Sequence, residues 1–218
     1  GEASEGVTAG SPAPQRDERV VFVFTGQGPE WAGMGRELYA HSPVFRAAMV
    51  ECDAVITRLA GWSLLDYLEA RPGARPLAGA DVIHPLLFAL QIGLARQWQA
   101  WGMRPAAVVG QSLGELAALC VAGSLSLTDA LALMIARSRL IHQLRGQGRM
   151  AMVGLSAEAA RAAFAAVSEP LYVVVERSPD SVIVAGAPAA VDAFVAQQTA
   201  AGVFCRIVVA DIATHCPI

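Results

Sequence analysis

Several features that would indicate other kinds of protein are missing from this chain of 218 residues. No block of basic residues interleaved with aromatics occurs, and the formal charge is −3, so nucleic acid is not an expected partner. No run of about eighteen apolar residues is present, and no basic stretch leads into an apolar one near the N-terminus. We therefore expect neither a membrane span nor a signal peptide.

Cysteine pairs with metal-ligand or redox spacing are also missing. The four cysteines show no Cys-x-x-Cys spacing and lie mostly in apolar segments, which favours buried, reduced thiols in a cytoplasmic protein. No cluster of metal ligands is visible. Gly26-Gln27-Gly28 lacks the third glycine and the acidic residue of a dinucleotide site, so we expect no tightly bound cofactor. An apolar content of 55% predicts a well-buried globular core, and the four tryptophans are expected in it.

The order of apolar segments predicts an α/β fold. Residues 1–19 have linker composition, rich in Gly, Ser, Ala and Pro. Two apolar runs, Val20–Phe24 and Ala106–Val109, have the pattern of strands buried on both faces. Because amphipathic helical segments alternate with them, we expect a parallel sheet covered by helices. The predicted helices span residues 43–59, 83–101, 116–122 and 127–144.

The pattern changes after residue 148. A strand, helix, strand, strand, helix, strand order is predicted between residues 149 and 209, which is the order of a ferredoxin-like unit. We therefore expect a main subdomain over residues 20–148, an inserted small subdomain over 149–209, and a return segment over 210–218. The predicted small-subdomain elements span residues 150–155, 157–167, 171–176, 181–185, 189–201 and 203–209.

One serine has the setting of a nucleophile. Ser112 stands in Gly110-Gln111-Ser112-Leu113-Gly114-Glu115, directly between a predicted strand and a predicted helix. This is the nucleophile-elbow pattern, in which flanking glycines permit a tight turn that exposes one hydroxyl. The pentapeptide alone also fits an ordinary glycine turn with a solvated serine. The helix that follows would direct backbone N–H groups and a positive dipole end at the hydroxyl, which suits acyl transfer.

A serine nucleophile needs a base, and histidine is the usual one. His41, His84 and His142 are predicted as surface or partly buried helix residues. His215 differs because it lies on a loop between predicted subdomains, directly before Cys216 and Pro217. It is therefore the candidate base.

Four ordered segments resemble the acyltransferase domain of type I polyketide synthases and, more broadly, malonyl-CoA:acyl-carrier-protein transacylases. These segments are Phe24-Thr25-Gly26-Gln27-Gly28 with Trp31 and Gly33-Met34-Gly35, Leu87-Phe88-Ala89-Leu90-Gln91, Gly110 to Glu115, and Ala213-Thr214-His215-Cys216-Pro217. The resemblance implies an α/β-hydrolase-like main domain with an inserted ferredoxin-like subdomain. In members of this family the chain continues for several tens of residues beyond the position that matches His215.

The resemblance implies a role for each matching residue. Ser112 would attack an acyl-CoA thioester, with His215 as general base and then general acid. Backbone N–H groups of Gln27 and Leu113 would form the oxyanion hole. The acyl group would pass to the phosphopantetheine thiol of an acyl carrier protein, and residues 1–19 would lead to a neighbouring ketosynthase domain.

The resemblance also assigns substrate-binding residues. Arg137 would pair with the free carboxylate of a malonyl-type group, because a guanidinium holds a carboxylate in two parallel hydrogen bonds. Gln111 replaces the histidine that more often precedes the nucleophile. Thr214 is small enough for a methylmalonyl branch, whereas Leu113 resembles malonyl-type domains, so the choice of extender unit stays open.

Two other functions use the same residues. A serine hydrolase such as a thioesterase shares the elbow, but it would normally need an acidic residue after the nucleophile to orient its histidine. Of the later aspartates, Asp180, Asp192 and Asp211, the last is read as a loop residue. A catalytically silent spacer domain would have no physical reason to keep Ser112, His215 and Arg137 together.

Overall fold

The computed structural model describes residues 19–28, 30–208 and 212–218. By internal contacts the chain divides into two compact units, residues 1–77 with 84–134 and residues 78–83 with 135–218. The division falls within two helices, α4 (Ala80–Ala100) and α6 (Leu127–Gln143). The predicted linker lies outside the described residues except for Arg19, and so does Asp211. The boundary at residue 148 stays a prediction.

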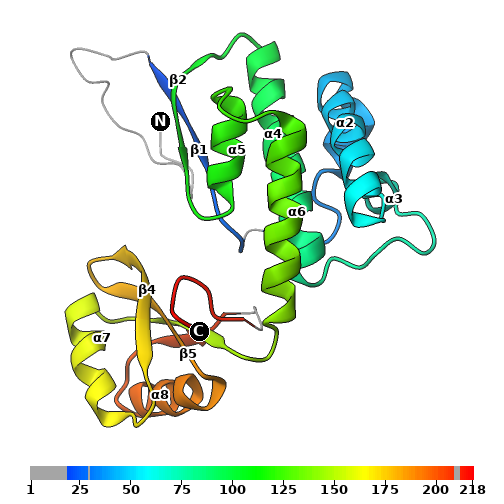
Figure 1. The fold of residues 1–218 in the computed structure, drawn as a ribbon. Helices are drawn as coiled ribbons and strands as arrows, with labels where there is room; N and C mark the ends of the chain where they lie inside the picture. Colours follow the sequence, from blue (N-terminus) through cyan, green and yellow to red (C-terminus); the bar gives the residue numbers. More distant parts are fainter. Residues whose placement is uncertain (1–18, 29, 209–211) are drawn as a thin grey trace, which may run out of the picture. The chain divides into compact units, whose positions relative to one another are not determined.

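The first unit contains a parallel pair of strands. β1 (Val20–Phe24) pairs with β2 (Pro105–Gly110), with Phe24 opposite Gly110. Helix α5 (Gly114–Val121) packs along both strands (Figure 1). Since the strands are parallel, the loops that follow them leave the same edge of the sheet. The segments carrying Gln27 and Ser112 are these two loops.

Both strands are less buried than predicted. Val21, Val23 and Val109 expose 48%, 66% and 53% of their surface. Burial on both faces requires a layer of structure on each, and within the described part of this unit α5 covers one face. The prediction of doubly buried strands is therefore wrong for the described residues.

Helices supply most of the core of the first unit. α1 (Arg36–His41), α2 (Pro43–Ala60) and α3 (Leu64–Leu68) precede α4 (Ala80–Ala100), and α6 (Leu127–Gln143) follows α5. Their apolar faces bury Phe45, Met49, Ile56, Leu64, Leu86 and Phe88. The helix predicted over 83–101 begins three residues earlier, which places Pro85 inside it.

The prediction for the tryptophans is wrong for three of the four. Trp62 is buried, whereas Trp31, Trp98 and Trp101 are exposed. Trp98 and Trp101 instead pack edge to face, with ring centroids 5.1 Å apart. An edge-to-face pair gains ring contact without full burial.

The second unit has an antiparallel sheet with the strand order β4-β5-β3-β6. The elements are β3 (Arg149–Val153), α7 (Ala157–Ala163), a 3₁₀ turn (Phe164–Ala166), β4 (Leu171–Ser178), β5 (Ser181–Gly186), α8 (Pro188–Ala200) and β6 (Cys205–Ile207). They follow one another in the predicted order. The core centres on Phe194, which is fully buried and meets Phe164 edge to face at 5.3 Å.

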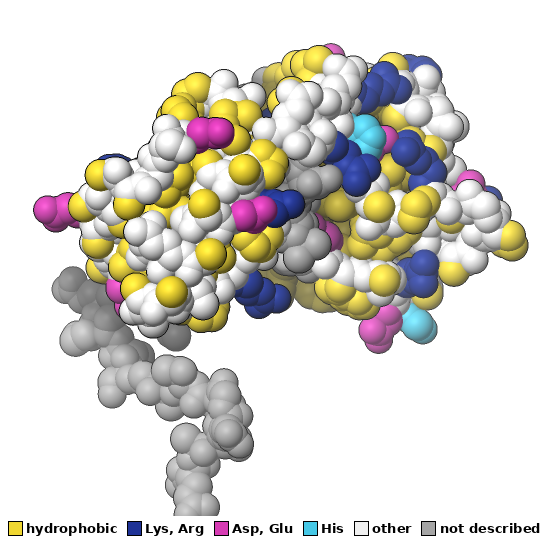
Figure 2. Space-filling view, turned by 90° about the horizontal axis from the view of Figure 1, so that it is seen from below, with side chains coloured by type: hydrophobic (Ala, Val, Ile, Leu, Met, Phe, Trp, Pro, Cys, Tyr) yellow, Lys and Arg dark blue, Asp and Glu magenta, His cyan; other side chains and the backbone are white. Residues whose placement is uncertain are grey.

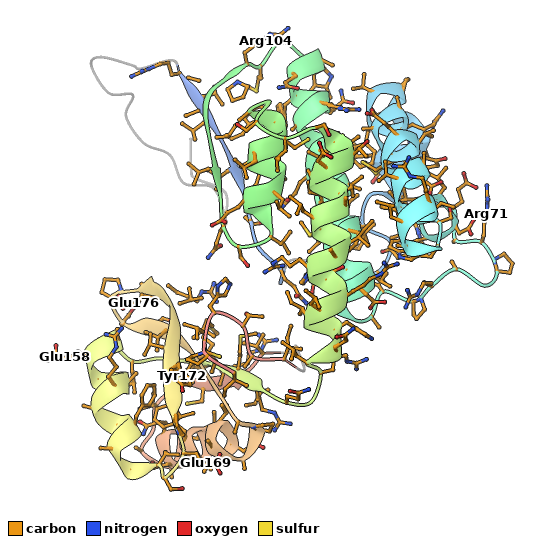
Figure 3. The ribbon with its side chains drawn as sticks, viewed as in Figure 1. Arg71, Arg104, Glu158, Glu169, Tyr172 and Glu176 are labelled. Atoms are coloured by element: carbon orange, nitrogen blue, oxygen red, sulfur yellow. The ribbon has the colours of Figure 1, made fainter. Side chains whose placement is uncertain are left out.

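The molecular surface is mixed in character. On the face that Figure 2 presents, hydrophobic, acidic and basic side chains are interspersed, and every basic one is arginine because the chain contains no lysine. Arg71, in the loop after α3 (Figure 3), pairs with Asp66 at 2.9 Å and also with Glu69. Across the described residues, no helix combines the length and apolar character needed to cross a membrane.

Candidate active site

The turn that carries Ser112 has a strained backbone. Ser112 adopts a φ of +54°, in the left-handed region that residues other than glycine rarely occupy. The turn is fixed by backbone hydrogen bonds from Gln111 N–H to Phe24 O (2.9 Å) and from Glu115 N–H to Ser112 O (3.1 Å). Leu113 is buried and is the N-cap residue of helix α5. The predicted strand, tight turn and helix are confirmed.

Two glycines make this turn possible through close approach. A Cβ atom at Gly114 would lie 2.2 Å from the carbonyl oxygen of Phe24 on the neighbouring strand. A Cβ at Gly110 would lie 2.4 Å from the Cα of Glu115. Both obstacles are backbone atoms, which cannot rotate away as a side chain can. Glycine is therefore required at both positions for sterics.

The loop after β1 lies beside Ser112. A Cβ built on Gly26 would come within 3.5 Å of both the Ser112 Cβ and the Gln111 carbonyl oxygen. Gln91 on α4 holds the start of this loop, since its side-chain Nε2 donates to the Thr25 carbonyl at 2.7 Å. The structure therefore brings the predicted Gln27 segment and Ser112 together.

A hydrogen-bonded chain of side chains holds Gln27. His84 Nε2 lies 2.8 Å from Gln27 Oε1, and Gln27 Nε2 donates to a Glu30 carboxylate oxygen at 3.3 Å. The other Glu30 oxygen accepts the Gly28 N–H at 2.7 Å. His84 is only 3% exposed. The sequence did not predict its contact with Gln27, because the two residues lie 57 positions apart. The sequence does place His84 and Gln91 seven residues apart, and therefore on one face of the helix.

The glycine-rich segment after this loop is anchored to α3. The Tyr67 hydroxyl accepts the Gly33 N–H at 3.0 Å, and the Arg36 guanidinium donates to the Tyr67 carbonyl. The same guanidinium lies over the Tyr67 ring, 5.3 Å from its centroid. These contacts fix where the chain leaves the loop near Ser112 and enters α1.

In the second unit, the predicted base also has an unusual backbone. His215 adopts a φ of +61° and its side chain is exposed. The residues before it, Ile212 and Ala213, are buried. A Cβ on Gly148 would lie 2.4 Å from the Ala213 Cβ, so glycine at 148 lets the loop approach the start of β3. Thr214 Oγ1 donates to the Met150 sulfur at 3.6 Å.

Arg137 lies on the part of α6 that belongs to the second unit, where it is partly buried, whereas Arg139 is exposed. Two residues along a helix point in different directions, so the two arginines have different surroundings. This difference makes Arg139 a matched control for Arg137.

The cysteines of the first unit are poor nucleophiles. Burial raises the pKa of the Cys52 thiol to about 12, and burial likewise raises the pKa of Cys120. The thiolate is the reactive form, so both are inert near neutral pH. Among the described residues, no group of three or more His, Cys, Asp or Glu is arranged to hold a metal ion.

The predicted site residues are distributed over both units. Gln27, Gln111, Ser112 and Leu113 lie in the first unit and are neighbours in space. Arg137, Thr214 and His215 lie in the second. That the two groups meet in one active site stays a prediction.

Comparison with known proteins identifies the family. The model of the acyl transferase domain matches residues 21–218, so the chain belongs to the acyl transferase domain family. The chain is 44% identical to erythronolide synthase EryA2 of Saccharopolyspora erythraea over 198 residues, which cover 91% of this chain and 6% of that protein. The resemblance inferred from the four motifs is therefore confirmed.

Solved structures agree. The acyltransferase domain from module 8 of the salinomycin polyketide synthase is 41% identical with a TM-score of 0.85, covering 91% of this chain and 47% of that one. A complex of a type II polyketide acyl-carrier protein with its malonyl-transacylase is 28% identical with a TM-score of 0.80, covering 91% and 65%. These matches confirm the α/β fold, and this chain spans about half to two thirds of these structures.

Proposed function

We propose that this chain forms part of an acyltransferase that moves a malonyl-type group from coenzyme A to an acyl carrier protein through an acyl-serine. The backbone of Ser112 carries the proposal. A φ of +54° in a turn enclosed by Gly110 and Gly114 is conformational strain without a structural benefit of its own. It is explained by the need to present a hydroxyl at the N-terminus of α5.

The chemistry follows from the residues in two half-reactions. In the first, Ser112 Oγ attacks the thioester carbonyl, its proton passes to His215, and the coenzyme A thiolate leaves and takes that proton. In the second, the carrier thiol gives its proton to His215 as its sulfur attacks the acyl-serine carbonyl; the bond to serine breaks, and the serine oxygen takes up that proton from His215. The Leu113 and Gln27 N–H groups would stabilise the oxyanion in both steps, since each lies in a segment next to Ser112.

The finer description of the fold belongs to the same proposal. The parallel pairing of β1 and β2, with α5 after the nucleophile, supports an α/β-hydrolase-like main domain. The strand order β4-β5-β3-β6 supports a ferredoxin-like small subdomain. A carrier protein as partner is supported by the transacylase complex among the similar structures. A ketosynthase next to residues 1–19 is inferred from the type I resemblance alone.

The substrate class rests on Arg137. Arg137 is partly buried, and a guanidinium suits the carboxylate of a malonyl or methylmalonyl group. Thr214, held near Met150, leaves room for an α-methyl branch, while Leu113 favours the unbranched group. Both extender units therefore belong in the test.

Acylation measured by intact mass tests the proposal in the full-length protein. Malonyl-CoA should add about 86 Da and methylmalonyl-CoA about 100 Da to the wild type, and neither should label Ser112→Ala. The label should move to a carrier protein when one is added. Release to water without transfer would favour the hydrolase, and an unmodified serine in folded, complete protein would favour the spacer.

The matched arginines test the substrate class. Arg137→Ala should lower malonyl transfer by about 10- to 100-fold, because a charge-assisted contact to the carboxylate is lost. Arg139→Ala should leave the rate within about twofold. Equal effects of the two substitutions would remove the support for a carboxylated substrate.

A further inference from the structure

His84 links helix α4 to the loop beside the nucleophile. It is a buried histidine whose ring nitrogen Nε2 lies 2.8 Å from the Gln27 side-chain oxygen. The imidazole thus contacts the loop directly, and the loop in turn lies beside Ser112. A hydrogen bond from the imidazole to Gln27 can fix the orientation of the backbone N–H groups of this loop.

The direction of this hydrogen bond is fixed by its neighbours. The Gln27 amide nitrogen donates to Glu30, so the Gln27 oxygen is turned toward His84. An amide oxygen can only accept, and therefore His84 must carry its proton on Nε2. Glu30 closes the arrangement by accepting the Gly28 N–H. Gln27, Gly28 and Glu30 are thereby held together through their side chains and through the Gly28 backbone.

The same face of α4 holds the loop at a second point. Gln91, two turns after His84, donates to the Thr25 carbonyl at 2.7 Å. The two α4 side chains therefore bind the loop on either side of Gly26, where an added Cβ would come within 3.5 Å of the Ser112 Cβ. A backbone N–H serves as an oxyanion donor only when it is aimed to within a fraction of an ångström.

We infer that His84 is a positioning residue: its Nε2–H holds Gln27 so that the backbone of this loop is aimed at the acyl oxygen on Ser112. The inference rests on the proposed acyl transfer for its catalytic consequence. Its structural part, that His84 orders the loop, is testable without any substrate.

Four variants separate positioning from folding. His84→Leu removes the donor, and His84→Gln keeps an N–H at similar reach. His84→Asn keeps the amide but is too short, which provides a comparison of reach if the leucine variant does not fold. His41→Gln, at an exposed helix histidine, is the control and should leave every measurement unchanged.

Backbone hydrogen exchange reads out the loop directly. His84→Leu and His84→Asn should speed the exchange of the N–H groups at residues 26–28 by about tenfold or more, while His84→Gln stays within about threefold of the wild type. Nitrogen NMR should find the His84 ring protonated on Nε2. Unchanged exchange in the leucine and asparagine variants would overturn the inference.

Acylation kinetics read out the consequence. His84→Leu and His84→Asn should lower the maximal rate of Ser112 acylation by about 100-fold, with the apparent affinity for malonyl-CoA within about twofold, and His84→Gln should restore most of the rate. Combined with Gln27→Leu, His84→Leu should cause little further loss, because both act through one contact. Independent, multiplying losses would overturn it.

The two possible failures are distinguishable. If the wild type itself is not acylated, the proposed function fails and hydrogen exchange alone decides whether His84 orders the loop. If the wild type is acylated and the His84 variants react at the same rate, only the positioning role is wrong.

Discussion

The two sheets of this protein are stabilised in different ways. The parallel pair β1–β2 is covered by α5 on one face and exposes valines on the other, and its loops carry the strained Ser112. The antiparallel sheet of the second unit buries its own core around Phe194. The comparison shows that the turn carrying the nucleophile depends on close contact between backbone segments at Gly110 and Gly114, whereas the second unit depends on side-chain packing.

The largest expected effect comes from breaking the packed core. Phe194→Ala should lower the free energy of unfolding of the second unit by about 3–5 kcal/mol, because a fully buried aromatic is lost and a cavity remains. All four tryptophans lie in the first unit, so tryptophan fluorescence reports the unfolding of that unit. Tyr172 on β4 (Figure 3) lies in the second unit and can report its unfolding. Phe204→Ala, at a residue 61% exposed, is the control. A milder effect at 194 than at 204 would contradict the comparison.

The next effect breaks the turn instead of the core. Gly114→Ala should slow Ser112 acylation by about 100-fold, because the added methyl group collides with the Phe24 carbonyl and displaces the nucleophile. Gly123→Ala is the matched control: its φ of +77° costs about 1 kcal/mol, but its Cβ meets open space. Intact mass against time measures both. Wild-type rates in Gly114→Ala would show that the turn tolerates a side chain.

The stability of the first unit should depend on pH in the alkaline range, because of the buried Cys52 thiol. The Cys52 thiol ionises near pH 9 in the unfolded chain and near 12 when folded, because burial raises its pKa. Between these values only the unfolded state releases the proton, so the stability of the first unit should fall by about 1.4 kcal/mol per pH unit. The chain contains no lysine, so the other side chains that titrate in this range are tyrosines and cysteines, Cys120 among them. Urea unfolding at pH 8, 10 and 11 measures the slope, and Cys52→Ala should reduce it.

The smallest effect concerns a helix terminus. Ser156 caps α7, where its hydroxyl accepts the Ala159 N–H at 3.2 Å, so Ser156→Ala should cost the second unit about 1 kcal/mol. Ser63→Ala removes the corresponding cap of α3 and also the hydrogen bond from the Ser63 hydroxyl to Asp53, so it should destabilise the first unit by at least as much. Thermal unfolding followed by circular dichroism compares the two. A cost at only one position would mean that capping depends on the surrounding unit.

The sequence predicted local structure well. Glycines around Ser112 indicated the elbow, and the patterns after residue 148 indicated the order of strands and helices in the second unit. It failed where burial depends on distant segments. The run Val20–Phe24 looks the same whether one face or both are covered, and the partner of His84 is far away in the chain. The role of Arg137 came from family resemblance alone, because no local pattern links it to Ser112.

The left-handed backbone at Ser112 has a practical consequence for engineering. Glycine adopts this conformation without steric cost, so a directed-evolution screen that selects for heat resistance alone would reward glycine at position 112. A variant selected in this way would be more stable and would lack the nucleophilic hydroxyl. Libraries built on this scaffold therefore need a chemical readout alongside the thermal one.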